Sequence, residues 1–114
     1  MVKYSNLQRR PTDMSWATQY IASLKEGKTV QFRPRGNSMT GRISSGQLCT
    51  VEPIKDFSTL SKGDIVLCKV NGNQYLHLIS AMQGERIQIS NNHGYVNGWT
   101  NQKNIFGKLI KVET

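Results

Sequence analysis

Short stretches of alternating apolar and polar residues, separated by turn-forming residues, dominate the sequence from residue 30 onward. A period of two places every second side chain on one face, as in a strand with one buried face. Turn signals recur about every 8 to 12 residues, a spacing typical of an all-β sandwich or barrel. We expect strands at residues 30–33, 48–51, 65–70, 74–81, 86–90 and 105–112.

Two of the connections carry strong turn chemistry. Asn71 and Gly72 lie between the third and fourth expected strands, and an Asn-Gly pair in this setting is the strongest short-range signal for a tight hairpin. Residues 91–98 are rich in asparagine and glycine, and we expect them to form a loop before the closing strand.

Only one segment has convincing helical periodicity. The Pro-Thr-Asp sequence at residues 11–13 supplies a helix-start signal and Gly27 an end signal. Between them lies an apolar stripe made of Trp16, Ala17, Tyr20, Ile21 and Leu24. We therefore expect a helix over residues 13–26, preceded by a polar and basic arm over residues 1–12.

The length of the chain limits it to one domain. A chain of 114 residues buries enough surface for a single core, so residues 13–114 are expected to form one unit. Hydrophobic residues make up 37% of the chain, which is enough for a small core and argues against a disordered protein. The expected fold class is mainly β, a barrel or sandwich of short strands with one N-terminal helix.

The chain is strongly basic, with a formal net charge of +8. Such a charge favours anionic partners such as nucleic acid, nucleotides, acidic proteins or a lipid headgroup layer. No run of Lys and Arg is longer than two residues, so the alternative interpretation is a generally solubilising surface.

The cysteines and the hydropathy of the chain indicate what kind of protein it is and where it is located. Cys49 and Cys68 form no CxxC pair and have no His at metal-ligand spacing, so we expect buried thiols and neither a zinc site nor a cofactor. No apolar run approaches the roughly 18 residues of a membrane helix, and the N-terminus lacks the apolar core of a secretion signal. The sequence therefore predicts a soluble, cytoplasmic protein without a membrane segment.

The segment RPRGNSMTG, residues 33–41, contains the first candidate for chemistry. Serine is a poor nucleophile until a base takes its proton, and the backbone N–H groups of a glycine-containing turn can stabilise an oxyanion. Ser38 is thus either a nucleophile or an ordinary turn residue. His77 is the candidate base, since a pKa of about 6.5 makes imidazole the usual general base at neutral pH. The alternative is a structural, hydrogen-bonded histidine or one that faces solvent.

Four segments in order carry a resemblance to a known family. They are GNSM at residues 36–39, LSKGDIVLCKVNGNQYLHLIS at 60–80, IQISNNHG at 87–94 and NIFGKLIKV at 104–112. Together they resemble the LexA-like and signal-peptidase-like serine peptidase superfamily, over residues 30–112. The resemblance implies the β fold of the LexA C-terminal domain and of signal peptidases, in a small stand-alone bacterial or phage member.

The resemblance also implies roles for individual residues. Ser38 corresponds to the nucleophile, and the backbone N–H groups of Ser38 and Met39 correspond to the oxyanion donors. His77 corresponds to the base, as in the branch of the superfamily that has His where others have Lys. Asp64 corresponds to a structural acid that caps the loop before a strand.

The third, acidic member of the His branch is missing from this sequence. The sequence SNNH stands in its place at residues 90–93. Asn91 or Asn92 is left to orient His77, as an asparagine does in papain-like enzymes, and His93 is a second candidate for the base. Loss of the orienting carboxylate can cost about 10⁴ in rate in a serine protease, so weak or lost activity is a specific alternative.

Arginines and aromatic residues near these motifs suggest a second kind of site. Arg33, Arg35 and Arg42 flank the serine turn and are the candidate anion-binding residues. Tyr95, Val96 and Trp99 are either core residues or part of a recognition loop. If Tyr95 or Trp99 lies near the arginines, a basic cleft with an aromatic platform would suit a nucleotide or single-stranded nucleic acid.

Two functions therefore follow from the sequence. The first is a serine peptidase-like hydrolase that acts on a peptide bond through a Ser38–His77 dyad. The alternative is a catalytically degenerate member of the same fold that binds an anionic ligand, either nucleotide or nucleic acid, or an acidic protein partner.

Overall fold

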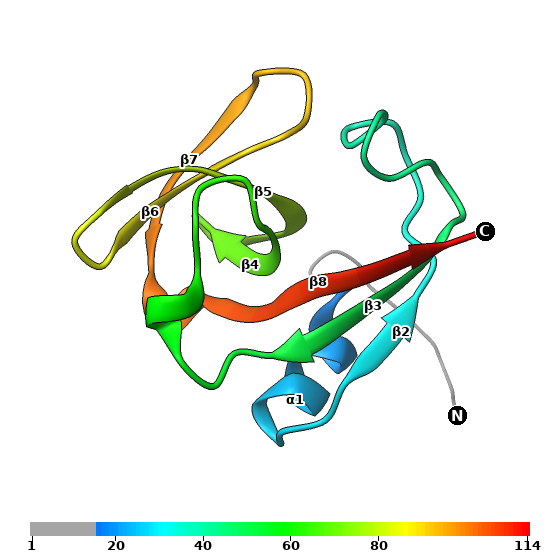
Figure 1. The fold of residues 1–114 in the computed structure, drawn as a ribbon, viewed down its shortest axis with the longest axis horizontal. Helices are drawn as coiled ribbons and strands as arrows, with labels where there is room; N and C mark the ends of the chain where they lie inside the picture. The colour runs from blue at the N-terminus through cyan, green and yellow to red at the C-terminus, as the bar shows by residue number, and fades with distance from the viewer. Residues whose placement is uncertain (1–15) are drawn as a thin grey trace, which may run out of the picture.

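The computed structural model describes residues 16–114, and β-strands make up nearly half of them (Figure 1). The regular elements are helix α1 (Thr18–Lys25) and strands β2 (Val30–Phe32), β3 (Leu48–Pro53), β4 (Ile65–Val70), β5 (Asn73–Gln83), β6 (Arg86–Ser90), β7 (Val96–Asn101) and β8 (Ile105–Glu113). Two short 3₁₀ turns, η1 (Phe57–Thr59) and η2 (Gln102–Asn104), complete them. The expected mainly β fold with one helix is confirmed.

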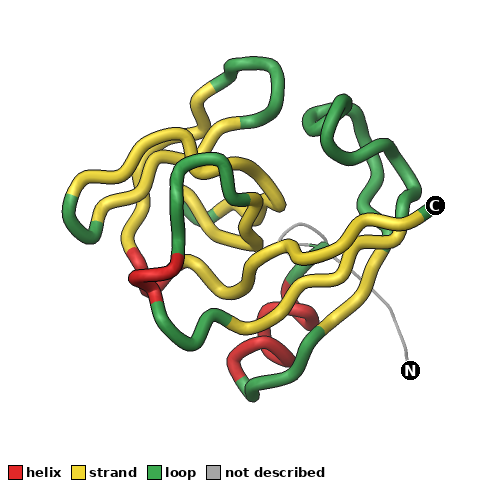
Figure 2. Tube along the Cα trace, viewed as in Figure 1, coloured by secondary structure: helices red, strands yellow, loops and turns green. Residues whose placement is uncertain are grey.

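All the strands belong to one curled antiparallel sheet of seven strands in the order β2-β3-β8-β4-β5-β6-β7. The C-terminal strand β8 lies between β3 and β4, so it joins the first strands of the chain to the hairpins that follow (Figure 1). The loop between β2 and β3 and the loop between β6 and β7 project from the same end of the sheet (Figure 2). This end carries the candidate site.

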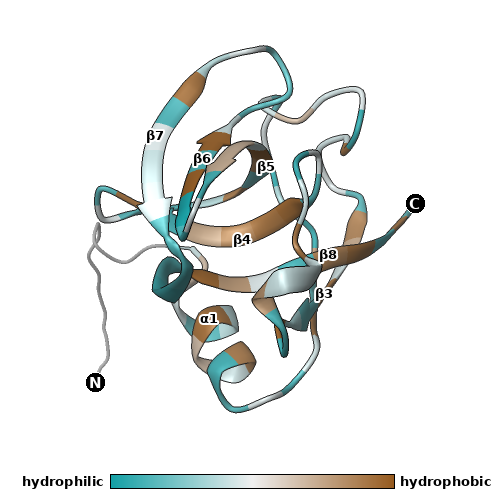
Figure 3. Cartoon of the chain, turned by 60° about the vertical axis from the view of Figure 1, so that its left-hand side comes forward, coloured by the Kyte–Doolittle hydropathy of each residue, from teal (hydrophilic) through white to brown (hydrophobic). Residues whose placement is uncertain are grey.

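Two hydrophobic clusters stabilise the sheet from its two faces. The first packs α1 against β2, β3 and β8, and the second lies between β4, β5, β6 and the η1 segment. Strand β4 contributes to both, because Ile65 and Leu67 belong to the first cluster while Val66, Cys68 and Val70 belong to the second. A strand buried on both faces has a nearly continuous apolar sequence, which β4 shows (Figure 3).

The helix lies unusually close to the sheet at Gly107 of β8. A Cβ atom at this position would lie 2.6 Å from Val51 Cγ1 and 2.9 Å from Leu24 Cδ1, too close for any side chain. Leu24 and Ile21 are the buried residues of the helix, as the apolar stripe predicted. A glycine here therefore allows the helix to pack against the centre of the sheet.

The helix is shorter than expected. It begins at Thr18 and ends at Lys25, whereas the sequence predicted residues 13–26. Residues 16–17 form a turn, and the Ala17 N–H donates a hydrogen bond to Gln74 Oε1 on β5, which fixes this turn on the sheet. The predicted start signal at residues 11–13 lies outside the described residues.

The expected Asn-Gly hairpin is present between β4 and β5. Asn71 and Gly72 both have positive φ angles, 50° and 83°, as a two-residue hairpin turn requires. Val70 pairs with Asn73 and Val66 with His77, so the turn sets the register that places His77 on the sheet. The strand that the sequence did not predict is β7, because its Asn-Gly pair resembles a turn.

The remaining sequence expectations concern thiols, metals and membranes. Cys49 and Cys68 are free and buried, and burial raises the pKa of the Cys68 thiol to about 12. Within residues 16–114, no group of three or more His, Cys, Asp and Glu side chains is placed to hold a metal ion. In the same range, no helix has the length and apolar character needed to cross a membrane.

Candidate active site

Ser38 lies on an exposed turn in the long loop between β2 and β3. The neck of this loop is closed by a hydrogen bond from Gly46 N–H to Pro34 O of 2.8 Å and by one from Gly36 N–H to Ser45 Oγ of 3.1 Å. The Met39 side chain is buried in the first hydrophobic cluster and so fixes the turn on the core. The Ser38 hydroxyl is thus presented to solvent on a well-supported segment.

His77 lies in the middle of β5 and is only 7% exposed. Its strand is paired on both sides, with β4 and β6, so its backbone position is fixed by the sheet. The Tyr75 ring, two residues earlier on the same face, stacks on the imidazole with ring centroids 4.8 Å apart. This stacking covers one face of the imidazole.

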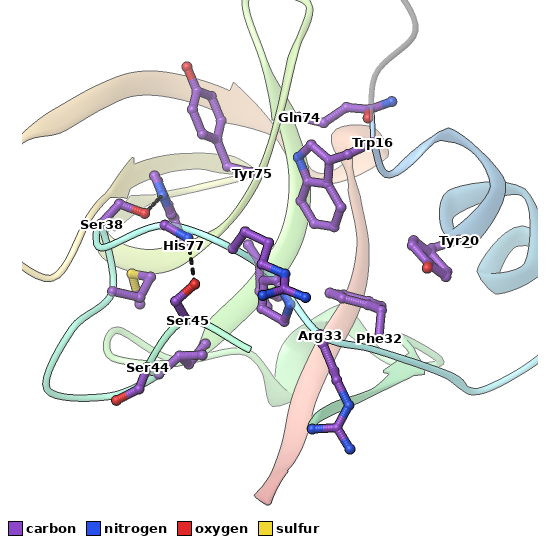
Figure 4. Close-up of a pocket in the computed structure, with 16 residues that line it drawn as sticks. Trp16, Tyr20, Phe32, Arg33, Ser38, Ser44, Ser45, Gln74, Tyr75 and His77 are labelled. Carbon is purple, nitrogen blue, oxygen red and sulfur yellow. Dashed lines mark hydrogen bonds between the residues drawn. The ribbon is translucent and has the colours of Figure 1, made fainter. Parts of the chain in front are cut away.

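The fold brings these two side chains into hydrogen-bond contact. Ser38 Oγ and His77 Nε2 are 3.1 Å apart although the residues are 39 positions apart in the chain (Figure 4). A nucleophile and its base are recognised by this kind of contact, at about 2.6–3.2 Å. The geometry therefore fits a serine whose proton is removed by an imidazole.

Asn97 of β7 holds the other side of the imidazole. Its Oδ1 lies 2.7 Å from His77 Nδ1. Because an amide oxygen only accepts hydrogen bonds, Nδ1 carries the proton, and the neutral imidazole presents Nε2 as an acceptor for the Ser38 hydroxyl. Asn97 thus selects the tautomer that a general base requires.

A β-bulge directs the Asn97 side chain toward His77. Ser90 pairs with Val96 while Ile89 pairs with Gly98, so Asn97 is the extra residue of β7 at this point. An extra residue interrupts the alternation of the strand and redirects a side chain. The bulge therefore gives Asn97 access to the imidazole from the neighbouring hairpin.

Neither Asn91 nor Asn92 contacts His77, contrary to the interpretation of the SNNH sequence. Asn91 Oδ1 accepts the N–H groups of His93 and Tyr95, at 2.8 and 2.9 Å, and so stabilises its own loop. Asn92 Nδ2 donates to Thr40 O at 2.8 Å. Their side chains are used for turn and loop contacts, which leaves Asn97 as the partner of the imidazole.

His93, the second candidate for the base, forms a hydrogen bond with the backbone of the Ser38 turn and not with the Ser38 hydroxyl. Its Nε2 lies 2.9 Å from Asn37 O and, facing a carbonyl, donates to it. The Asn92 N–H also donates to Ser38 O, at 2.9 Å. Residues 92 and 93 therefore bind three carbonyls of the Ser38 turn, those of Asn37, Ser38 and Thr40. We call this set of contacts the loop clamp.

The backbone that follows Ser38 forms hydrogen-bonded turns. Met39 O accepts the N–H groups of Arg42 and Ile43, at 2.9 and 2.8 Å. Within residues 16–114, the N–H groups of Ser38 and Met39 donate no hydrogen bond. Both sequence-predicted oxyanion donors are thus free to bind a developing negative charge.

The protonation state of His77 follows from its surroundings. Burial lowers the pKa of His77 below its ordinary value, since desolvation disfavours the charged ring, and the hydrogen bond that Nδ1–H donates to Asn97 Oδ1 partly offsets this by raising the pKa. The imidazole is therefore neutral at neutral pH and able to accept a proton.

Comparison with known families agrees with this geometry. A scan against protein families matches residues 3–110 to the family described as Peptidase S24-like. The chain belongs to the Peptidase S24-like family. The match covers nearly all of the 114 residues and confirms the resemblance that the four motifs carried. A search of curated proteins found no match.

In this Peptidase S24-like protein, a pocket of about 650 Å³ extends from the Ser38–His77 pair (Figure 4). Arg33 and Arg35 line it, while Arg42 lies outside it and donates to Gly63 O at 3.3 Å. The aromatic residues that line the pocket are Trp16, Tyr20, Phe32 and Tyr75.

The sequence named the wrong aromatic residues for such a pocket. Tyr95 and Trp99 are not among its lining residues. They are not core residues either, because Tyr95 is 66% and Val96 46% exposed, and Trp99 packs under the Arg86 guanidinium at 5.8 Å. Tyr95 lies in the loop before β7 and Trp99 on β7 itself, and neither side chain lines the pocket.

Proposed function

We propose that this Peptidase S24-like protein is a serine hydrolase that cleaves peptide bonds through Ser38 and His77, with Asn97 orienting the imidazole. The observation that carries the proposal is the pair of hydrogen bonds on the two imidazole nitrogens, from Ser38 Oγ to Nε2 and from Nδ1 to Asn97 Oδ1. Together they align nucleophile, base and orienting group in one line.

The chemistry follows the usual two steps of acyl transfer. The Ser38 oxygen adds to the peptide carbonyl carbon while its proton passes to His77 Nε2, and the Ser38 and Met39 N–H groups stabilise the oxyanion. The carbon–nitrogen bond then breaks, and the proton on Nε2 goes to the leaving amine. Water attacks the resulting ester and gives a proton to Nε2, and the bond to Ser38 Oγ breaks as the oxygen recovers that proton.

Asn97 supports this cycle less strongly than a carboxylate would. An amide oxygen holds the ring in the correct tautomer but carries no charge to stabilise the imidazolium that forms during each proton transfer. The same arrangement of imidazole and asparagine is used in papain-like enzymes. A slow hydrolase is therefore the expected outcome.

A serine-directed fluorophosphonate probe tests the proposal directly. Wild type should be labelled covalently, Ser38→Ala not at all, and His77→Gln at least about 100-fold more slowly, because the probe reacts only with an activated hydroxyl. Ser61→Ala is the matched control, since Ser61 is exposed and outside the pocket lining. Labelling that survives in Ser38→Ala, or a wild type that reacts no faster than His77→Gln, would refute the proposal.

A second candidate function is anion binding without hydrolysis. The amide at the third position and the two arginines of the pocket favour it. Under this alternative, wild type and Ser38→Ala bind an anionic ligand equally and with strong salt dependence, and neither reacts with the probe.

A further inference from the structure

The pocket beside the Ser38–His77 pair is larger than a scissile peptide bond requires. Its volume of about 650 Å³ lies within the range of roughly 300–1,000 Å³ that is usual for sites that enclose a ligand. It extends from Ser38 and His77 to Trp16, in the turn that precedes α1 (Figure 4). The walls therefore contact groups beyond the reacting carbonyl.

An aromatic cluster of Trp16, Tyr20 and Phe32 forms the part of the pocket wall that lies beside α1. The Tyr20 and Phe32 rings stack with centroids 4.6 Å apart, and Trp16 meets Phe32 edge-on at 5.3 Å. Phe32 is buried, whereas Trp16 is 48% exposed. Gln74 fixes this end of the helix, because it accepts the Ala17 N–H at 2.8 Å and its Nε2 donates to Thr18 Oγ1 at 3.1 Å.

This cluster is a preformed surface for a flat apolar group. A tilted contact with Tyr20, at 6.4 Å, and the edge-on contact with Phe32 hold the Trp16 ring, so a ligand meets little conformational entropy cost at this wall. A half-exposed Trp that lines a pocket leaves apolar area for another aromatic ring to cover, which offset or edge-on packing favours.

The charges of the pocket have one sign. Among residues 16–114, its lining contains Arg33 and Arg35 and no carboxylate. One nitrogen of Arg33 is engaged with Gly46 O at 2.9 Å. Within the same range Arg35 has no hydrogen-bond acceptor and no salt-bridge partner, and its exposed guanidinium is available to a ligand. A carboxylate is the complementary group, which a guanidinium binds with two parallel hydrogen bonds.

We propose that this pocket selects peptides in which an aromatic residue and an acidic residue stand close to the bond that is cleaved. The aromatic side chain packs on the wall of Trp16, Tyr20 and Phe32, and the carboxylate binds Arg35. The selectivity rests on the proposed hydrolase for its catalytic consequence, but binding does not require turnover. A peptide is favoured over a nucleotide because the pocket opens on a hydroxyl–imidazole pair and the free N–H groups of Ser38 and Met39, which fit a peptide carbonyl.

The test measures binding to the 114-residue chain that carries Ser38→Ala, which cannot consume the ligand. Four fluorescein-labelled peptides of one background sequence carry Phe-Glu, Ala-Glu, Phe-Gln or Ala-Gln at the centre, and their affinities are compared by fluorescence anisotropy. We expect Phe-Glu to bind tightest, with a loss of about fivefold or more for each single replacement.

Two further variants test which residue of the pocket is responsible for each peptide preference. Arg35→Gln should abolish the preference for Glu over Gln and keep that for Phe over Ala, and Trp16→Ala should do the reverse. A merely structural defect would weaken all four peptides alike, so the ratios separate recognition from folding. Arg86→Gln is the matched control for the loss of an arginine charge, because Arg86 lies over Trp99 and outside the pocket lining.

The outcomes distinguish this proposal from the proposed hydrolase. Selective binding by Ser38→Ala with no fluorophosphonate labelling of wild type would support the pocket and refute the hydrolase. Labelling without selectivity among the four peptides would refute the pocket selectivity alone. Tighter binding of ADP or of a single-stranded oligothymidylate than of the Phe-Glu peptide, lost in Arg35→Gln, would overturn the choice of a peptide.

Discussion

The Ser38 hydroxyl and the His77 imidazole of the candidate site are held in place by different kinds of structure. His77 lies on β5, which is hydrogen-bonded to β4 on one side and β6 on the other. Ser38 lies on an exposed turn whose carbonyls are bound by the loop clamp of Asn92 and His93. Sheet pairing is cooperative and deeply buried, while the turn depends on a few hydrogen bonds near solvent.

The hairpin of β6 and β7 connects these two regions. Its loop supplies the clamp on the Ser38 turn, and its strand supplies Asn97 for the imidazole of His77. One short element thereby sets both the hydroxyl and the ring. Substitutions in this hairpin should separate the two effects, because Asn97 acts on the ring and Asn92 on the turn.

The largest expected effect comes from the reacting groups themselves. Ser38→Ala and His77→Gln should each lower kcat/KM for a cleaved peptide by about 10³-fold or more. The double variant should be no worse than either single variant, because the two residues act as one unit. Steady-state kinetics on the three purified variants measures this, and losses that multiply in the double variant would show that the groups act independently.

Asn97 should have the next largest effect, and different substitutions there should shift the pKa of His77 in opposite directions. Asn97→Ala should reduce kcat/KM by about 10- to 100-fold, because the ring loses its preferred tautomer. The hydrogen bond that His77 donates to Asn97 raises the pKa of His77, so its removal should move the acidic limb of the pH–rate profile to lower pH.

Asn97→Asp gives the opposite shift. A carboxylate beside the ring stabilises the imidazolium, raises the pKa of His77 and moves the acidic limb to higher pH. Above that limb, kcat/KM should rise by about tenfold, since the imidazolium formed in the reaction gains a charged partner. Identical pH profiles for wild type, Asn97→Ala and Asn97→Asp would exclude Asn97 as the orienting residue.

The sequence was sufficient to name the two groups that meet, but not the group that orients them. Ser38 lies in a recognisable motif, and the Asn71-Gly72 turn fixes the register of His77 through local residues alone. Asn97 contacts the ring only because a bulge interrupts β7, and a bulge depends on pairing between strands that alternation does not encode.

The sequence also did not predict the aromatic wall of the pocket, because this too depends on tertiary contacts. Trp16 and Tyr20 fit the apolar stripe of a helix, and such a stripe is normally buried against the sheet. The helix begins only at Thr18, so Trp16 precedes it and packs on Phe32 at the edge of the sheet instead. Tertiary contact of residues far apart in the chain decides which part of a stripe stays exposed.

A smaller effect is expected from the loop clamp. Asn92→Ala removes the hydrogen bond to Thr40 O and should lower kcat by about threefold to tenfold, because Ser38 spends less time in contact with Nε2. The acidic limb of the pH–rate profile should stay in place, since the surroundings of His77 are unchanged. Asn101→Ala is the matched control at the end of β7, where the side chain makes no capping hydrogen bond.

The smallest expected effect concerns stability and pH. The pKa of His77 is lower in the folded protein than in the unfolded chain, so the unfolded chain binds more protons as the pH falls below about 6.5. The contribution of His77 to the free energy of unfolding is therefore complete above about pH 6.5, and it should decrease as the pH falls until the pH passes the folded pKa.

Urea denaturation at about pH 7.5 and 5.5 measures this loss of stability. His77→Gln should have a flatter pH dependence than wild type. An equal slope in His77→Gln and wild type would mean that burial of this imidazole does not control its protonation, and the neutral base on which the reaction depends would lose its physical basis.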